Sequence, residues 1–286
     1  MNVLHGDKPR MVDLEQSCPH CLCRLPLLAS FLAAAVLGII FVAAPAAPAA
    51  TLDEGVEQYR SHLTADVDRA LASTQTLRAS AAAGDVAAAK QAWLDARVGW
   101  ERSEVFTGGF VPELDRAIDA WPNGAAGFHA IEAKLFGANR TDFADEANEL
   151  VHNLSELSAK ARSMPLTPQR LLDGVVRLAY EVGESKVDGG ESRVSGTSLD
   201  DMRNNVDGIE LAWRTIFSSA LEARDRQLDA DLLRRIDALK AMVGGRDLRR
   251  IDSDKLRTVT EELVLRLQNA APLLDLKEPT LEADAR

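Results

Sequence analysis

The sequence predicts an all-α protein made of two up-and-down helical bundles. Apolar residues recur at steps of three and four from Thr51 onward, which is the spacing of one buried helix face. The chain has no run of alternating β-branched residues, and only 5% of its residues are aromatic. Pro165 and Pro168 lie near the midpoint of this part, so we place the bundles over 51–164 and 165–277. One elongated bundle is the alternative.

The first bundle is predicted to begin with a long amphipathic helix over 51–83. Gly84 and Asp85 interrupt the pattern and start a second helix, whose buried stripe is Ala89, Trp93, Ala96 and Trp100. A loop rich in Gly and Pro is predicted over 107–124. A short helix follows over 127–137, and then a longer one over 141–162 with Thr141 as its N-cap.

The second bundle is predicted to open with Thr167 as an N-cap and Pro168 at the first helical position. A polar, Gly-rich segment over 183–198 ends at Ser198, where a further helix begins. Two more helices are predicted near 228–243 and 253–271. Pro272 ends the last one, and residues 278–286 form a flexible tail.

The first fifty residues have the pattern of an export leader. Residues 25–44 form a charge-free apolar run, preceded by Arg24 and followed by small residues in A-x-A spacing up to Ala50. This pattern is typical of a secretory signal peptide. Because about twenty apolar residues can also span a bilayer, an uncleaved N-terminal membrane anchor is the alternative. In both cases the part from Thr51 onward is predicted to lie outside the cytoplasm, in the periplasm or cell envelope.

The charge of the chain argues against some partners and favours others. The formal net charge is −11, and the charges within residues 1–50 cancel, so the exported part is acidic. An acidic surface repels nucleic acid and anionic lipid, whereas it suits cations or simply solubility. All three cysteines (Cys18, Cys21 and Cys23) precede the apolar run. The exported part therefore has no disulfide and no thiol ligand.

A histidine and a carboxylate share one face of the short helix GFHAIEAKLFG. His129 and Glu132 are three residues apart, so their side chains project to the same side. Imidazole nitrogen and carboxylate oxygen together suit iron, zinc or manganese. An ordinary structural or exposed pair is the alternative.

Further carboxylates lie nearby in the sequence. Glu101 and Glu104 are three residues apart at the predicted end of the second helix, where negative charge opposes the helix dipole. A positive side chain or a bound cation must then be close. Asp115 and Asp119 follow in the predicted loop and add oxygen ligands for a hard or borderline cation.

Several stretches of the chain resemble the imelysin-like peptidase family (peptidase M75), in its EfeO/EfeM iron-uptake branch. In the first half these are WERSE (100–104), LDRAID (114–119) and GFHAIE (127–132). In the second half, residues 181–199 and NNVDG (204–208) resemble a second family block. The resemblance covers 51–274.

The second block departs from the family pattern at three positions. Val194, Gly196 and Ser198 stand where the family has Tyr, His and Asp. Any function that the family places in this loop is therefore in doubt here, and packing is the expected role of the segment.

The resemblance implies an imelysin-like double bundle that captures a metal outside the cytoplasm. The form is the short EfeM type, without a cupredoxin-like domain. The implied cargo is iron, as Fe2+ or Fe3+, with Zn2+ or Cu2+ as alternatives, and no organic cofactor. The implied partners are an EfeU-type permease and an EfeB-type haem peroxidase. The protein is expected to be a monomer that does not bind nucleic acid.

We expect a mixed set of imidazole and carboxylate ligands, with no catalytic residues. The primary metal ligands are predicted to be His129, Glu132, Glu101 and Glu104, with Asp115 in support. Asp119 is expected to be a helix-terminal or salt-bridge residue, and the cations expected to balance the metal-free site are Arg97, Arg102 and Lys134.

Two other functions remain open. A metallopeptidase would need a general base, for which Glu104 is the candidate, but the sequence has no HExxH motif. A helical protein that binds acidic polysaccharide would need a cation to bridge it to this acidic chain.

Overall fold

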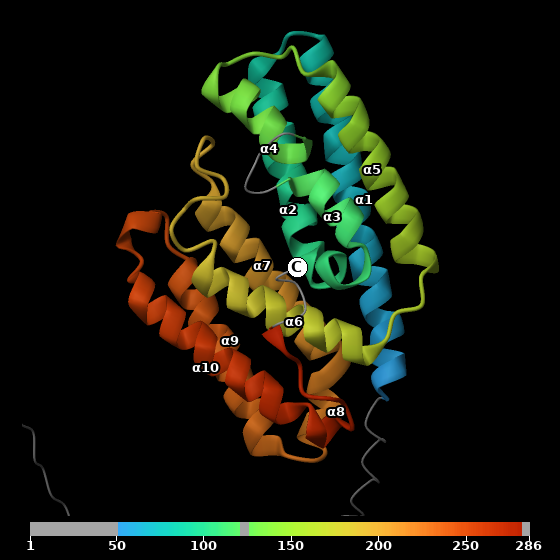
Figure 1. Ribbon diagram of the computed structural model, residues 1–286, viewed down its shortest axis with the longest axis vertical. Helices are drawn as coiled ribbons and strands as arrows, with labels where there is room; N and C mark the ends of the chain where they lie inside the picture. The colour runs from blue at the N-terminus through green and yellow to red at the C-terminus, as the bar shows by residue number, and fades with distance from the viewer. Residues whose placement is uncertain (1–50, 121–125, 282–286) are drawn as a thin grey trace, which may run out of the picture. The chain divides into compact units, whose positions relative to one another are not determined.

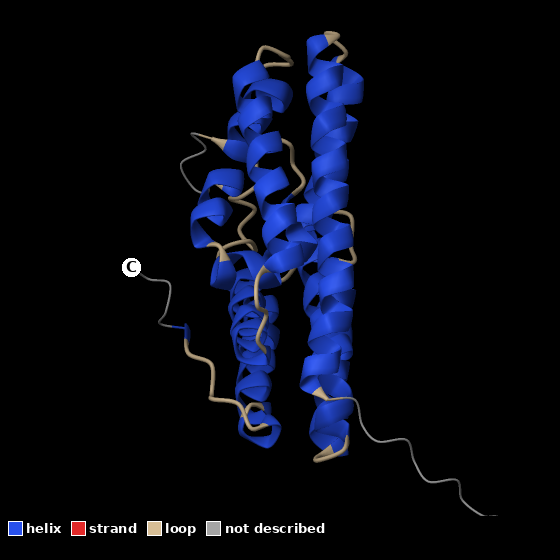
Figure 2. Cartoon of the chain, turned by 90° about the vertical axis from the view of Figure 1, so that its right-hand side faces the viewer, coloured by secondary structure: helices blue, strands red, loops and turns tan. Residues whose placement is uncertain are grey.

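The computed structural model describes residues 51–120 and 126–281 of the chain. Every regular element in this part is a helix, so the all-α prediction is confirmed (Figure 2). The predicted signal peptide or anchor and the end of the tail lie outside the described residues. Within the described part, no helix is both long enough and apolar enough to cross a membrane.

The first half of the described chain forms one group of helices. Figure 1 shows α1, α2 and α5 packed lengthwise, and the short helices α3 and α4 lie against α5. The helices of this group are α1 (Leu52–Ala82), α2 (Val86–Phe110), α3 (Pro112–Asp119), α4 (Gly127–Glu132) and α5 (Ala144–Ser163). Helix α4 continues into a π-helical turn, η1 (Ala133–Gly137).

The second half forms another group of helices, seen in the lower part of Figure 1. Its elements are α6 (Pro168–Glu184), α7 (Ser198–Ala212), η2 (Trp213–Phe217), α8 (Ser218–Glu222), α9 (Arg226–Val243), η3 (Leu248–Arg250), α10 (Ser253–Ala270) and η4 (Pro272–Leu274). As predicted, the side chain of Thr167 caps α6 by accepting a hydrogen bond from the backbone N–H of Arg170.

Helix α2 packs against helices of both groups. It contacts α1 in the first group and α6 and α7 in the second. The contact with α6 is so close that a Cβ on Gly174 would lie 1.9 Å from the carbonyl oxygen of Val105. Charged side chains on α2 can therefore meet residues from both halves of the sequence. The division into bundles at residues 164 and 165 stays a prediction.

Two predicted boundaries are wrong. The expected loop over 107–124 is helical at its start, because α2 runs through Phe110 and α3 follows directly. Glycine normally weakens a helix, but here it leaves room for Arg177, whose guanidinium carbon would lie 2.4 Å from a Cβ on Gly108. In addition, α5 begins after Phe143 and is not capped by Thr141. The buried ring of Phe143 anchors this start in the core.

Gly127 fixes how α4 meets the end of α3. Its φ is +61°, and a Cβ there would lie 1.9 Å from the carbonyl oxygen of Ile118. Only glycine fits both the left-handed conformation and the close approach. The contact sets the position of His129, two residues later, against the end of α3.

Substitution of Gly127 should therefore test the site more than the fold. We expect Gly127→Val to weaken metal binding roughly tenfold or more, as for other residues that position ligands, with helicity nearly unchanged. Metal titration and circular dichroism measure the two effects. Gly245→Val is the matched control, because a Cβ there meets nothing within 4 Å. Equal loss of helicity and binding would mean that Gly127 serves the fold alone.

Candidate metal centre

A cluster of buried charged side chains lies where α2, α3, α4, α7 and the segment 185–197 meet. Each member is at most 7% exposed. The members are Arg97, Glu101, Glu104, Asp119, His129, Glu132, Lys186, Glu191 and Asp201. Six of them are carboxylates and only two are permanently charged cations. Because unpaired buried charge is costly, this excess of carboxylates suits an additional cation.

His129 bridges two carboxylates with its two ring nitrogens. Its Nε2 lies 3.5 Å from Oδ1 of Asp119, and its Nδ1 lies 3.0 Å from Oε2 of Glu132. The other oxygen of Glu132 accepts hydrogen bonds from the backbone N–H and the hydroxyl of Ser195, at 2.7 and 2.6 Å. Ligating histidines commonly donate their second N–H to a carboxylate, which fixes the ring. The geometry therefore favours Nε2 as the metal-facing atom and Glu132 as the group that orients the ring.

Two groups of ligand atoms within the described residues are compact enough to hold a metal ion. One contains Asp119, His129 and Glu191, and the other contains Glu101, Glu104 and Glu191. Within each group the ligand atoms lie within 4.8 Å of one another. Glu191 belongs to both groups, so the two positions adjoin each other.

Asp115 lies beside the cluster and not in either group. It lines a cavity of about 170 Å³ together with Glu104, Asp119, Lys186 and Glu191. Burial raises the pKa of Asp115 to about 6, although Arg177 acts in the opposite direction. The cavity connects Asp115 with both ligand groups, and a supporting role for it stays a prediction.

Arg97 holds several carboxylates of the cluster together. Its guanidinium forms ion pairs with Glu101 and Asp119, and it lies 3.2 Å from Asp201 and 3.5 Å from Glu191. Burial alone would raise the pKa of Asp119, but Arg97 and His129 hold it well below its usual range. Asp119 is thus the helix-terminal salt-bridge residue that the sequence predicts, and it also faces His129.

Comparison with known proteins shows the family of this chain. The family model for imelysin (peptidase M75) matches residues 55–126 and 123–274. The chain belongs to the imelysin family. An "Efem/EfeO family lipoprotein" of Staphylococcus haemolyticus is 30% identical over 209 residues, which cover 68% of this chain and 71% of that protein. An "Iron uptake system component EfeO" of Yersinia pseudotuberculosis is 31% identical, over 64% of this chain and half of that protein.

A solved structure supports the same fold. It is a crystal structure of an iron-regulated protein A precursor from Parabacteroides distasonis, with a TM-score of 0.62. The match covers 80% of this chain and 96% of that one, at 17% sequence identity. At this identity the likeness shows the fold alone.

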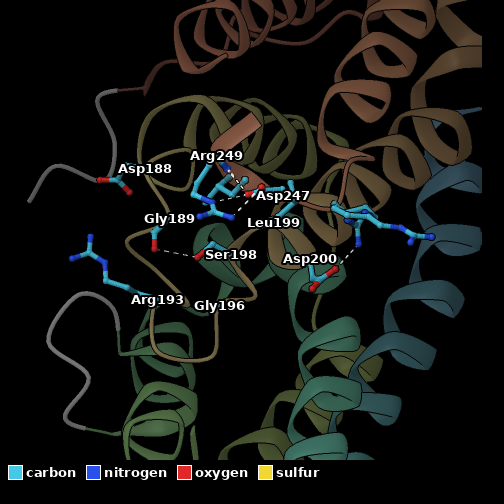
Figure 3. A pocket seen from close by; sticks show the side chains of 12 residues that line it. Asp188, Gly189, Arg193, Gly196, Ser198, Leu199, Asp200, Asp247 and Arg249 are labelled. Atoms are coloured by element: carbon cyan, nitrogen blue, oxygen red, sulfur yellow. Dashed lines mark hydrogen bonds and ion pairs between the residues drawn. The ribbon is translucent and has the colours of Figure 1, made fainter. Parts of the chain in front are cut away.

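The segment 185–197 of this imelysin-family chain contributes to the cluster despite its departures from the family pattern. Ser198, which directly follows the segment, links two parts of it: its hydroxyl accepts a hydrogen bond from the backbone N–H of Ser192 and donates one to the carbonyl of Gly189. Figure 3 shows the contact between Ser198 and Gly189 at the wall of a neighbouring cavity of about 660 Å³. Val194 is 50% exposed, whereas Ser195 binds Glu132. The segment therefore has a role beyond packing, because its Ser195 holds Glu132, the carboxylate that contacts His129.

The cations around the cluster differ from those that the sequence suggested. Arg97 lies in the cluster as expected. Arg102 instead pairs with Asp66, 3.1 Å away, and Lys134 pairs with Glu146. The second cation of the cluster is Lys186. The dipole argument for Glu101 and Glu104 also fails, because α2 extends to Phe110 and places both residues inside the helix.

Sequence reasoning missed four members of the cluster or its surroundings. They are Lys186, Glu191, Asp201 and Asn205. All four lie within or beside the second block that resembles the family. That resemblance was the only feature of the sequence that pointed to this region.

The protonation of His129 should make metal binding depend on pH. Burial lowers its pKa, but the hydrogen bonds to Asp119 and Glu132 outweigh burial and raise the pKa to about 9. Below that pH the imidazole carries a proton that a metal must displace. Affinity should therefore rise with pH, by up to roughly tenfold per unit between pH 6 and 8. Competition with a chelator for Zn(II) at several pH values measures this, and a pH-independent affinity would exclude His129 as a ligand.

Proposed function

We propose that this protein captures one iron ion, or a similar transition-metal cation, outside the cytoplasm for transfer to a membrane permease. The observation that carries the proposal is the buried imidazole of His129 facing Asp119 and Glu191 in a cluster with excess carboxylates. Mixed nitrogen and oxygen ligands suit iron, zinc and copper alike. The relatives named as an iron-uptake component and as lipoproteins favour iron and an envelope location.

In this proposal the ligands are Nε2 of His129 and the carboxylates of Asp119 and Glu191. Glu132 holds the imidazole through Nδ1, and Ser195 holds Glu132. Glu101 and Glu104, both predicted from the sequence as primary ligands, add negative charge beside the ion. Asp115 lies on the cavity through which an ion could reach the cluster.

The protein then acts as a carrier and not as an enzyme. An EfeU-type permease would receive the ion, and an EfeB-type haem peroxidase would serve the same system. The name of the family includes peptidase, but the carboxylate of Glu132 that accepts from the hydroxyl of Ser195 is already engaged with the imidazole of His129, so we assign this pair to holding the ring and not to catalysis.

Metal analysis of the purified protein tests this function. We expect one tightly bound ion per chain after incubation with Fe(II), Fe(III), Zn(II) or Cu(II) one at a time, and competition among them gives the preferred metal. A casein assay on the loaded protein runs alongside. Absence of stoichiometric binding, or metal-dependent casein cleavage, would contradict the carrier role.

A further inference from the structure

Lys186 lies at the centre of the second ligand group. Its Nζ is 3.0 Å from Oε2 of Glu101, 3.0 Å from Oε2 of Glu104 and 2.9 Å from Oε1 of Glu191. The lysine is 4% exposed, and the three glutamates are between 0% and 7% exposed. Burying an ammonium is unfavourable unless anions surround it, so these carboxylates are what keeps it there.

The same carboxylates have the arrangement of a metal site. Their ligand atoms lie within 4.8 Å of one another and surround one point, which Nζ occupies. Asn205 closes the group by donating from Nδ2 to Glu101 and Glu104, at 2.8 and 2.6 Å. The Oδ1 atom of this fully buried amide has no hydrogen-bond partner within the described part of the chain.

We propose that the cluster is a two-cation centre in which the ammonium of Lys186 fills one position and the captured metal fills the other. This inference rests on the proposed function, since it assigns the metal to the Asp119, His129 and Glu191 group. Glu191 is shared by both positions, so the charge at one acts on the ion at the other. A lysine carries one positive charge where a metal ion would carry two or three. The lysine therefore limits the wild-type protein to one metal ion and lowers the repulsion between the two positions.

Lys186 is placed where it can act as a fixed occupant. It follows the end of α6 by two residues, and its backbone N–H donates to the carbonyl of Glu181 at 3.1 Å. Its side chain reaches from the second half of the chain to two glutamates on α2. Two of the three glutamates that hold the ammonium, Glu101 and Glu104, thus come from a separate element, whereas Glu191 lies in the same segment as Lys186. A substitution at Lys186 therefore leaves the backbone that carries the two glutamates of α2 unchanged.

The number of bound ions tests the inference. Lys186→Met removes the charge at nearly constant length, so metal per chain should rise from one in the wild type to two. Equilibrium dialysis against Zn(II), followed by elemental analysis, measures this ratio. Lys186→Arg keeps a cation and should stay at one. The double variant Lys186→Met with Glu104→Gln removes a ligand of the second position and should also stay at one.

The outcomes separate this inference from the proposed function. One ion in both the wild type and Lys186→Met would overturn the inference alone. No ion in either protein would overturn both. If Lys186→Met is unfolded without metal, circular dichroism with added Zn(II) replaces the count. Recovery of helicity on adding Zn(II) would support a metal in place of the ammonium, and no recovery would overturn it.

Discussion

Replacing Arg97 with methionine should lower the free energy of unfolding of the metal-free protein by about 3–5 kcal/mol. The guanidinium is 2% exposed and contacts Glu101, Asp119, Glu191 and Asp201. Methionine would keep most of the packing but leave these carboxylates without their shared cation. Breaking a buried ion pair from one side is costly because the remaining charge stays buried.

Urea denaturation with a matched surface variant measures this loss. Arg226→Met is the control, because its side chain is 82% exposed and its pair with Glu222 lies at the surface. Such pairs contribute about 0–1 kcal/mol. A loss below about 1 kcal/mol for Arg97→Met would mean that the carboxylates take up protons instead of remaining charged in the variant.

Arg97 also shows why part of the site could be predicted from the sequence. It shares α2 with Glu101 and Glu104, and residues three or four apart on a helix lie on one face. Periodicity therefore indicated this local group, as it indicated the buried stripe of α2 and the pair His129 and Glu132. The same local information predicted the cap of α6 at Thr167.

The remainder depends on contacts between distant parts of the chain. Lys186 and Glu191 lie in a polar, Gly-rich segment, a composition typical of a solvated loop. Their burial follows from the packing of that segment against α2 and α4. Lys186, for example, contacts Glu104 and Glu101, which lie 82 and 85 residues earlier in the sequence. The helical stretch at Gly108 was missed for a similar reason, because the neighbour of Gly108 is Arg177, a residue distant in the sequence. Periodicity carries no information about such contacts.

Replacing His129 with alanine should abolish the stabilisation of the protein by metal. With free metal at about 100 times the dissociation constant, the wild type should gain about 2.7 kcal/mol. For a domain of this size that gain corresponds to a rise in melting temperature of roughly 5–10 °C. The variant loses Nε2, the nitrogen that faces Asp119, so its melting temperature should be the same with metal and with chelator.

Two further variants separate the roles of the residues around His129. Glu132→Gln should weaken metal binding about 10–100-fold without abolishing it, because Glu132 orients the imidazole through Nδ1. His152→Ala should leave the metal-dependent rise intact, because His152 is exposed on α5. Thermal unfolding of the three variants and the wild type, with chelator and with Fe(II) or Zn(II), measures these effects. A full metal-dependent rise in His129→Ala would exclude His129 as a ligand, and it would leave His129 and Glu132 as a structural pair that joins α4 to the segment containing Ser195.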